Sequence, residues 1–388
     1  MTVSESTSRL YERFLELLAP GAGPAGPTAG PTAGPTAGAH GREPVRARYG
    51  ERIDGEGRTH PVVITRDAWI LNQIDMALSF DQLLTADDVV VVAAPYELSF
   101  VGAGVDRAIE MIGASVISVG TSNTICPMPR LLGLIEEYGA TALVCAPSLA
   151  TELASLAASA ERPFDRSSVR SVICVGEACS RKRLDRIGAA WGAGACALYG
   201  TPSVPTVAVP CAYGALHVCD DRLRASVRDV PDGRTGPEGT GEGGRRPQGA
   251  VTRGELLLAP ADTTAPGDES RATGELVELG PADGSCACGE KSPVLTPLGR
   301  VSGAVSGRSG PVSAVDVERV VFDCADLAPH FACEVRDGGF DVTCAVPDGD
   351  AVRDPEAKRS LEKRLRAELD VDVEVRIVAV DDWSTAVS

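Results

Sequence analysis

The region between residues 61 and 199 alternates short, continuous apolar runs with amphipathic segments. The apolar runs are rich in valine and alanine, and helical segments of about ten residues separate one run from the next. Continuous apolar runs are typical of strands that are buried on both faces of a parallel sheet. The pattern therefore predicts an α/β fold in which helices flank a parallel sheet. The predicted strands are residues 88–94, 115–119, 142–146, 169–175 and 195–199, and the predicted helices are residues 102–112, 129–138, 149–158 and 184–191.

The pattern changes beyond residue 228, where stretches rich in glycine, proline and charged residues predict loops. Two short apolar segments beside these loops predict strands of a hairpin type, which form a β-rich part of the large domain. Past residue 300, two β-runs meet at Asp337, Gly338 and Gly339, residue types that supply the positive φ angles of a tight hairpin turn. The predicted loops are residues 228–250 and 260–271, the strands are residues 254–259, 273–279 and 371–380, and the helices are residues 315–322 and 355–369.

These segments suggest an order of domains. Residues 1–20 predict a short N-terminal helix, and residues 21–44 form a Gly/Pro-rich linker in which the sequence GPTA occurs three times. Proline lacks an amide donor and glycine is entropically costly to order, so this segment favours a flexible linker. We expect a large α/β domain over residues 45–300 and a small C-terminal α+β domain over residues 301–388.

Charge and composition exclude several classes of partner. The chain carries 37 Lys and Arg against 54 Asp and Glu, a net charge of −17. An acidic surface repels phosphate, so we expect neither a nucleic acid nor a membrane as a partner. The sequence has no apolar run of about 18 residues, which a membrane-spanning helix needs. The N-terminus lacks the basic start and apolar block of a signal peptide, and the expected location is the cytoplasm.

The 12 cysteines divide into two groups. In a long chain with no export signal we expect reduced thiols rather than disulfides. Cys126, Cys145, Cys174 and Cys196 lie in apolar runs, where a thiol packs as a small apolar side chain.

A second group has the spacing of a metal site. Cys286 and Cys288 flank one residue in a polar, Gly-containing loop, and Cys211 and His217 come from an earlier segment. Three thiolates and an imidazole suit tetrahedral Zn²⁺, and a site filled by four protein ligands is structural. Cys219 is an alternative ligand. The competing interpretation is a set of unrelated side chains with an exposed cysteine pair.

A series of short segments, in the right order, resembles the phenylacetate–CoA ligase branch of the adenylate-forming superfamily. This resemblance covers most of residues 45–380. It implies a two-step reaction in which a carboxylate attacks the α-phosphate of ATP, and a thiol such as coenzyme A then displaces AMP from the acyl-adenylate. Many members of that family also carry a Cys/His cluster at the places described above. The segments are residues 61–69, 95–104, 113–122, 134–148, 175–180, 198–203, 211–221, 254–259, 271–279 and 298–303.

The resemblance also implies site residues. Tyr199 corresponds to a tyrosine that packs against a purine or aryl ring, and the alternative is a core tyrosine at a strand end. Glu275 corresponds to the acidic residue that binds the ribose hydroxyls, and the alternative is an ordinary strand position. Tyr96 and Phe100 correspond to the wall of the acyl pocket. The residues implied for nucleotide or cofactor binding are Glu177, Tyr199, Gly200, Glu275 and Arg300.

Other positions depart from the family pattern. Asp54 and Glu56 place carboxylates in the loop that holds phosphates in the family. Pro202 and Ser203 stand where the family has threonine and glutamate, and a hydroxyl is a weaker Mg²⁺ ligand than a carboxylate. Ser302 and its neighbour Gly303 likewise replace acidic residues after Arg300.

The catalytic lysine of the family is also missing from its expected place. The nearest candidates, Lys358 and Lys363, lie on the charged helix and are expected to be solvated. Together with the altered phosphate and metal positions, this predicts that ATP-dependent adenylation is lost or altered.

Three functions therefore remain open. The first is a phenylacetate–CoA ligase-like protein of specialised metabolism that handles an aryl or acyl carboxylate, or a thioester of coenzyme A or a carrier protein. The second is a competent ATP- and Mg²⁺-dependent acid–CoA ligase. The third is a non-catalytic scaffold that binds a partner enzyme. Besides the small-molecule substrate, two partners stay open: a second copy of the chain, which would make a homodimer, or a partner enzyme.

Overall fold

The computed structural model describes residues 47–53, 58–121, 124–159, 168–230, 251–261, 270–307, 310–347 and 355–387. The predicted N-terminal helix and the Gly/Pro-rich linker lie outside these residues. Asp54 and Glu56 do as well.

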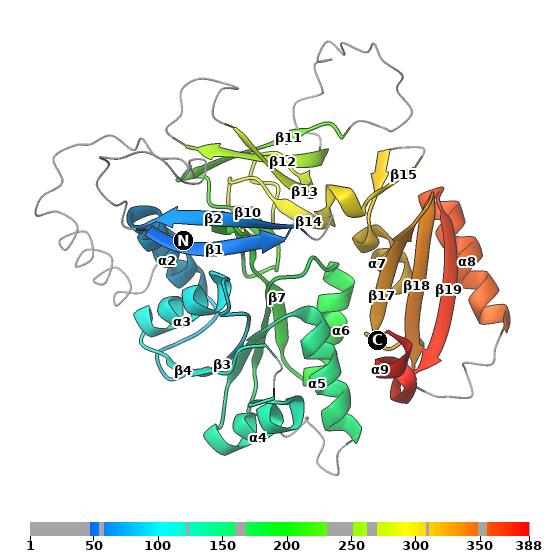
Figure 1. The fold of residues 1–388 in the computed structure, drawn as a ribbon, viewed down its shortest axis with the longest axis horizontal. Coiled ribbons are helices and arrows are strands. Elements are labelled where there is room, and N and C mark those ends of the chain that lie inside the picture. Colours follow the sequence, from blue (N-terminus) through cyan, green and yellow to red (C-terminus); the bar gives the residue numbers. More distant parts are fainter. Residues whose placement is uncertain are drawn as a thin grey trace, which may run out of the picture.

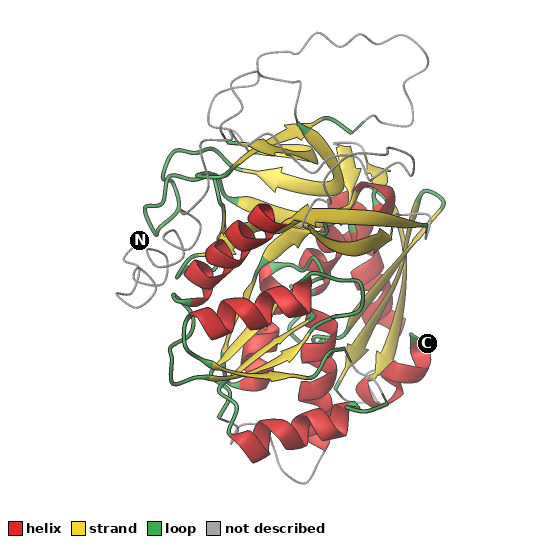
Figure 2. Cartoon of the chain, turned by 60° about the vertical axis from the view of Figure 1, so that its left-hand side comes forward, coloured by secondary structure: helices red, strands yellow, loops and turns green. Residues whose placement is uncertain are grey.

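We call the described residues up to Arg300 the large part. A five-stranded parallel sheet forms its centre, in the order β4-β3-β5-β6-β7 (Figure 1). Alternate residues of β3 face opposite sides, so Val90 and Val92 pack with α2 and α3, whereas Val91 packs with α4, α5 and α6. Helices thus cover both faces, which confirms the predicted fold class (Figure 2). The strands are β3 (Val89–Ala93), β4 (Ser115–Ser118), β5 (Ala142–Cys145), β6 (Ser171–Cys174) and β7 (Gly194–Ala197), and the helices are α2 (Arg66–Phe80), α3 (Val101–Met111), α4 (Met128–Tyr138), α5 (Pro147–Ser159) and α6 (Arg181–Trp191).

Antiparallel strands form the other layer of the large part. β1 and β2 make a hairpin, β8, β9 and β10 make a three-stranded sheet, and β11 to β14 make a four-stranded sheet. The last two sheets share an apolar core that includes Val207, Leu256 and Val277. The strands are β1 (Ala47–Ile53), β2 (Thr59–Thr65), β8 (Tyr199–Thr201), β9 (Val204–Pro210), β10 (Leu216–Val218), β11 (Leu223–Arg228), β12 (Thr252–Pro260), β13 (Arg271–Leu279) and β14 (Leu295–Arg300).

The described residues from 310 onward have a sheet and an apolar core of their own, and we call them the C-terminal unit. The three-stranded sheet has the order β17-β18-β19, with α7 and α8 on one face and α9 on the other. Gly338, with φ of +73°, supports the tight turn of the β17–β18 hairpin, as the sequence predicts. The short ladder β15 (Val305–Gly307) and β16 (Gly310–Val312) leads into the unit, whose further elements are α7 (Ala314–Val321), β17 (Phe331–Arg336), β18 (Gly339–Val346), α8 (Pro355–Leu369), β19 (Asp372–Ala379) and α9 (Trp383–Ala386).

The pattern of apolar residues does not predict α2. Its buried positions include the polar residues Asn72, Gln73 and Ser79, which interrupt the apolar stripe. Among the described helices, none is long and apolar enough to cross a membrane.

Candidate functional site

Three of the residues implied for nucleotide binding lie near one another in the structure. They are Tyr199 of β8, Glu275 of β13 and Arg300 of β14. Glu275 and Arg300 are directly opposite each other in the antiparallel pair β13–β14, and Glu275 Oε1 lies 4.0 Å from Arg300 Nε. Burial raises the pKa of Glu275, whereas the positive charge of Arg300 acts in the opposite direction. Burial, and then the charge of Glu275, raise the pKa of Tyr199. The three residues therefore form one electrostatically coupled group.

The hydroxyl of Tyr199 is the unusual member of this group. Its oxygen is buried and makes no hydrogen bond to any described residue. A buried hydroxyl without a partner is unfavourable, since it has lost its hydrogen bonds to water. The phenol therefore has a donor that no described residue uses.

Two glycines set the backbone geometry of the group. A Cβ at Gly200 would overlap the carbonyl of Pro205, so only glycine allows β8 to approach β9 this closely. Gly274 has φ of +77°, which glycine adopts without strain. Its amide donates to Glu255 Oε1 at 3.1 Å, and Thr273 Oγ1 accepts from the amide of Glu275 at 3.1 Å. This local network fixes the position from which the Glu275 side chain projects.

Glu177 lies on the loop that follows β6. The amide and hydroxyl of Ser148, in the first turn of α5, donate to its carboxylate at 3.2 and 2.6 Å. A carboxylate at a helix N-terminus is electrostatically favourable. Glu177 therefore ties together the loops at the carboxyl ends of β5 and β6, where α/β sheets bind ligands. No hydrogen bond or ion pair among the described residues joins Glu177 to Tyr199 or Glu275.

Tyr96 lies in the loop between β3 and α3, and Phe100 is the residue directly before α3. The Tyr96 hydroxyl donates to Asp106 Oδ1 at 2.8 Å, and burial raises its pKa. Phe100 is 6% exposed and packs against Val62 of β2, with its ring centroid 6.0 Å from that of Trp69. Phe100 thus belongs to a small apolar cluster beneath the β1–β2 hairpin, and the tyrosine hydroxyl already has a protein partner.

The segment that departs from the family pattern after Gly200 is a tight turn. Pro202 and Ser203 connect β8 to β9, and the hydroxyls of Thr201 and Ser203 lie 3.3 Å apart. The amide of Val204 also donates to Thr201 Oγ1 at 3.1 Å. The turn therefore offers hydroxyls that bond to one another and no carboxylate.

Two further residues have ordinary structural surroundings. Lys358 pairs with Glu362 on the same face of α8 at 3.7 Å, as expected for a solvated helix face. Burial raises the pKa of Cys179 to about 12, which keeps this thiol protonated and unsuited to nucleophilic attack.

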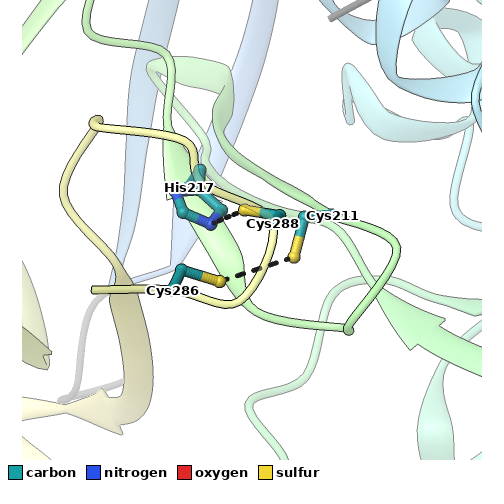
Figure 3. A group of neighbouring side chains, drawn as sticks. All are labelled: Cys211, His217, Cys286 and Cys288. Carbon is teal, nitrogen blue, oxygen red and sulfur yellow. Dashed lines mark hydrogen bonds between the residues drawn. The ribbon is translucent and has the colours of Figure 1, made fainter. Parts of the chain in front are cut away.

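The four predicted metal ligands form a tight cluster in the described chain. The ligand atoms of Cys211, His217, Cys286 and Cys288 all lie within 4.8 Å of one another (Figure 3). The Sγ atoms of Cys211 and Cys286 are 3.9 Å apart, and Cys288 Sγ is 3.3 Å from His217 Nε2. Sulfur ligands of a tetrahedral zinc ion lie about 3.8 Å apart, because each Zn–S bond is about 2.3 Å long. The spacing of the cluster therefore fits one such ion.

The surroundings of His217 orient its ring. His217 is 4% exposed, and its Nδ1 lies 3.1 Å from the carbonyl oxygen of Ser292. A proton on Nδ1 donated to this carbonyl leaves the lone pair of Nε2 facing the sulfur atoms, the usual arrangement of a metal-binding histidine. The amide of Glu290 donates to Cys288 Sγ at 3.4 Å. The Ser292 hydroxyl also lies 3.4 Å from Nδ1. No sequence motif pointed to Ser292, since its shorter contact is through the backbone carbonyl.

Two separate segments supply these ligands. Cys211 follows β9 and His217 lies in β10, while the two remaining cysteines lie in the loop between β13 and β14. A bridge between His217 and Val294 joins the segments directly. Cys219 is not a member of the cluster, and burial raises its pKa to about 12. The cluster therefore consists of the four ligands predicted first, and the alternative ligand Cys219 does not belong to it.

Comparisons with known proteins bear on the fold. Residues 56–244 match the family model described as AMP-binding enzyme. No curated protein matches the chain by sequence. A crystal structure of 2-hydroxyisobutyryl-CoA ligase in the postadenylation state, in complex with 2-HIB-AMP, has a TM-score of 0.68 at 17% identity, covering 86% of this chain and 70% of that chain.

Two further solved structures are similar. The amide bond synthetase McbA from Marinactinospora thermotolerans has a TM-score of 0.57 at 20% identity, covering 83% of this chain and 63% of its own. Apo MatB from Rhodopseudomonas palustris has a TM-score of 0.54 at 16% identity, covering 85% of this chain and 63% of its own. At these identities the likeness is one of fold.

Proposed function

We propose that this chain, a member of the adenylate-forming superfamily, binds the nucleoside part of an adenylate but activates carboxylates with ATP poorly or not at all. Its substrate is an aryl or acyl carboxylate, or the corresponding thioester of coenzyme A or a carrier protein, as in the phenylacetate–CoA ligase branch. We assign it to specialised metabolism. The observation that carries the proposal is the convergence of Tyr199, Glu275 and Arg300 beside a β8–β9 turn that lacks a carboxylate.

The retained residues suit a nucleoside. The Glu275 carboxylate supplies acceptors for the paired hydroxyls of a ribose. Burial raises the pKa of Glu275, and the charge of Arg300 opposes that rise by favouring the ionised form. The Tyr199 ring supplies a flat apolar surface, and its unpartnered hydroxyl supplies a donor. These groups recognise sugar and base without requiring a triphosphate.

The altered residues concern phosphate and metal. Mg²⁺ in nucleotide sites is held by one or two carboxylates together with substrate phosphates. Pro202 and Ser203 provide no carboxylate, and their turn is closed by its own hydrogen bonds. Lys358 and Lys363, the lysines nearest the expected position, lie on α8. Charge compensation of the triphosphate is therefore weak.

Pyrophosphate release tests this function. The purified chain is incubated with ATP, Mg²⁺ and a panel of aryl and short-chain acids, with coenzyme A present. We expect release that is no faster than in reactions without the acid. Acid-dependent release with turnover of about one per second, an ordinary enzymatic rate, would refute the proposal.

The second candidate is a competent acid–CoA ligase. It is supported by the solved structures of similar fold, one of which is a complex of 2-hydroxyisobutyryl-CoA ligase with 2-HIB-AMP. The same pyrophosphate assay distinguishes the two functions. A chain that binds neither AMP nor an acyl thioester would instead support a non-catalytic scaffold.

We further propose that Cys211, His217, Cys286 and Cys288 hold a structural zinc ion. The chemistry of the donors and their spacing support zinc, and four protein ligands leave no open position for water. The ion would join the β9–β10 connection to the β13–β14 loop. Metal analysis of the purified protein tests this, with one zinc per chain expected and a clearly substoichiometric content contradicting it.

A further inference from the structure

Helix α2 buries three polar side chains, and one of them has no hydrogen-bond partner among the described residues. Asn72 Oδ1 accepts from the amide of Thr206 in β9 at 3.3 Å, and its Nδ2 donates to the carbonyl of Ala68 at 2.7 Å. Ser79 Oγ donates to a backbone carbonyl one turn earlier at 2.7 Å. Gln73, by contrast, is 5% exposed, and both its Oε1 and its Nε2 are buried without a partner.

The position of Gln73 in α2 is one that an apolar residue would fill well. Trp69 lies one turn before it and Ala77 one turn after it, and both belong to apolar clusters. A methionine or leucine at position 73 would pack there without losing hydrogen bonds to water. Buried polar atoms of folded proteins nearly always have a hydrogen-bond partner. The amide therefore points to a partner from outside the described chain.

The Gln73 amide faces α3, which lies beside α2 (Figure 1). A Cβ built on Gly104 of α3 would lie 3.5 Å from Gln73 Nε2, 3.7 Å from its Oε1 and 3.6 Å from Trp69 Cη2. Both side chains of α2 thus border the one place on α3 at which glycine leaves out a methyl group. Phe100, one turn earlier, has its ring centroid 6.0 Å from that of Trp69. The amide therefore adjoins a pair of aromatic rings.

Helix α2 also connects this place to the strands of the proposed nucleoside site. Thr206 of β9 bonds to Asn72 a second time, since its hydroxyl donates to the Asn72 carbonyl at 3.4 Å. β9 pairs with β8, the strand that carries Tyr199. The residue next to Gln73 is thus anchored to the sheet on which the nucleoside is proposed to lie.

The chemistry of a carboxamide limits what it can bind with both of its polar atoms. It presents one acceptor and one donor group side by side. A hydroxyl group satisfies both, because it can donate to Oε1 and accept from Nε2. A carboxylate only accepts and an ammonium group only donates, so each would leave one amide atom without a partner. The rings of Trp69 and Phe100 supply apolar surface for the carbon skeleton that carries the hydroxyl.

We infer that Gln73 selects substrates whose acyl or aryl group carries a hydroxyl, which the amide binds between α2 and α3 at Gly104. The inference rests on the proposed function, since the hydroxyl belongs to the carboxylate or thioester substrate named there. Gln73 is a specificity-determining residue in this account, and Gly104 keeps the place beside it free of a side chain.

Thermal denaturation of the chain without added ligand tests the state of the amide. Gln73→Met keeps the length of the side chain and should raise Tm by about 2 °C or more, because it removes a buried polar group that has no partner. Asn72→Leu is the matched control from the adjacent position, and it should lower Tm because it removes hydrogen bonds to Ala68 and Thr206. A Gln73→Met chain that loses as much stability as Asn72→Leu would overturn the inference.

Calorimetric titration tests the ligand. The probes are phenylacetate with its ring-monohydroxylated derivatives, and butyrate with its monohydroxylated derivatives. At least one hydroxylated acid should bind about tenfold or more tightly than its parent acid, because a site built to bond a hydroxyl disfavours the analogue that lacks it. Gln73→Met should reduce this ratio to about one while the parent acid binds within about twofold as before. Gly104→Ala should do the same, since its Cβ fits without overlap but occupies the place of the hydroxyl.

The results that contradict the inference are distinct from a failure of the proposed function. A ratio of about one for every pair in the unmodified chain, a ratio that Gln73→Met leaves unchanged, or the absence of binding by all the acids overturns the inference. AMP titrated into the same chains reports on the Tyr199 group alone, and its affinity should be unaffected by Gln73→Met. Loss of AMP binding by the unmodified chain would instead count against the proposed function.

Discussion

Glu275 and Arg300 lie opposite each other on neighbouring antiparallel strands, with 4.0 Å between carboxylate and guanidinium. The pair places a carboxyl group and its opposing cation near a buried tyrosine hydroxyl that has no partner among the described residues. This relationship is central to the proposed function, because it retains the means of holding a nucleoside where the metal and phosphate positions have changed.

Replacing Glu275 with glutamine tests the role of its charge. Glu275→Gln keeps the shape of the side chain but removes the anionic acceptor, so AMP affinity should fall about tenfold, the effect of losing a charged hydrogen bond. Calorimetric titration measures this. Glu334→Gln, on an exposed position of β17, is the control and should bind AMP as the unmodified chain does. Equal affinity in the two variants would remove Glu275 from the site.

Metal removal should destabilise the β10 region of the large part. A chelator that strips the zinc leaves three thiols and a buried imidazole without their common partner, so we expect Tm to fall by about 5 °C or more. Differential scanning calorimetry with and without the chelator measures the change, and added zinc should reverse it.

The choice of ligands has its own test. Cys286→Ser should lower the zinc content to well below one per chain, because serine is a poor zinc ligand. Cys219→Ser is the matched control from the same region and should retain the metal. If Cys219→Ser loses zinc and Cys286→Ser does not, the ligand set is wrong.

Gly200→Ala should distort the strand that carries Tyr199. Its Cβ would overlap the Pro205 carbonyl, so β8 must shift, with a loss of about 1–3 kcal/mol in the free energy of unfolding and weaker AMP binding. Chemical denaturation measures the first effect. Gly133→Ala in α4 is the control, because its Cβ meets only the end of Arg130 at 3.9 Å, and it should be neutral or stabilising. Unchanged stability in the Gly200→Ala variant would contradict the close approach of β8 and β9.

Acid should weaken the packing of the C-terminal unit through His330. Burial, and then the charge of Arg183, lower the pKa of His330 from 6.5 to about 4. Between these values the unfolded chain binds a proton that the folded chain does not, so stability falls as pH falls from about 6.5 to about 4, by about 2 kcal/mol. In His330→Gln this contribution is absent. Denaturation at pH 7 and pH 4.5 measures it, and an equal pH dependence in both chains would show that His330 titrates normally.

The sequence predicts the central sheet well because its strands are continuous apolar runs. β3, β5 and β6 lie within the predicted ranges, and their neighbours form the expected order of helices. The Cys-x-Cys motif is equally local, and the structure brings its two thiols to within reach of Cys211 and His217. Such features depend on residues that are close in the sequence or chemically distinctive.

Other features depend on packing that no local pattern reveals. Arg183 and Glu318 are 135 positions apart, and each is a charged helix residue of a kind that usually faces solvent. Only the docking of α7 on α6 buries them together. The nearest partner of His217 Nδ1, the carbonyl of Ser292, is likewise a backbone atom and carries no sequence signal.

Parallel calorimetric titrations with AMP and with ATP, each with and without Mg²⁺, test the central claim most directly. We predict that AMP binds, and that Mg²⁺ changes the affinity for ATP by less than about threefold, because the β8–β9 turn lacks a carboxylate to hold the metal against the phosphates. Absence of AMP binding, or an affinity for ATP that rises more than about tenfold with Mg²⁺, would contradict the claim.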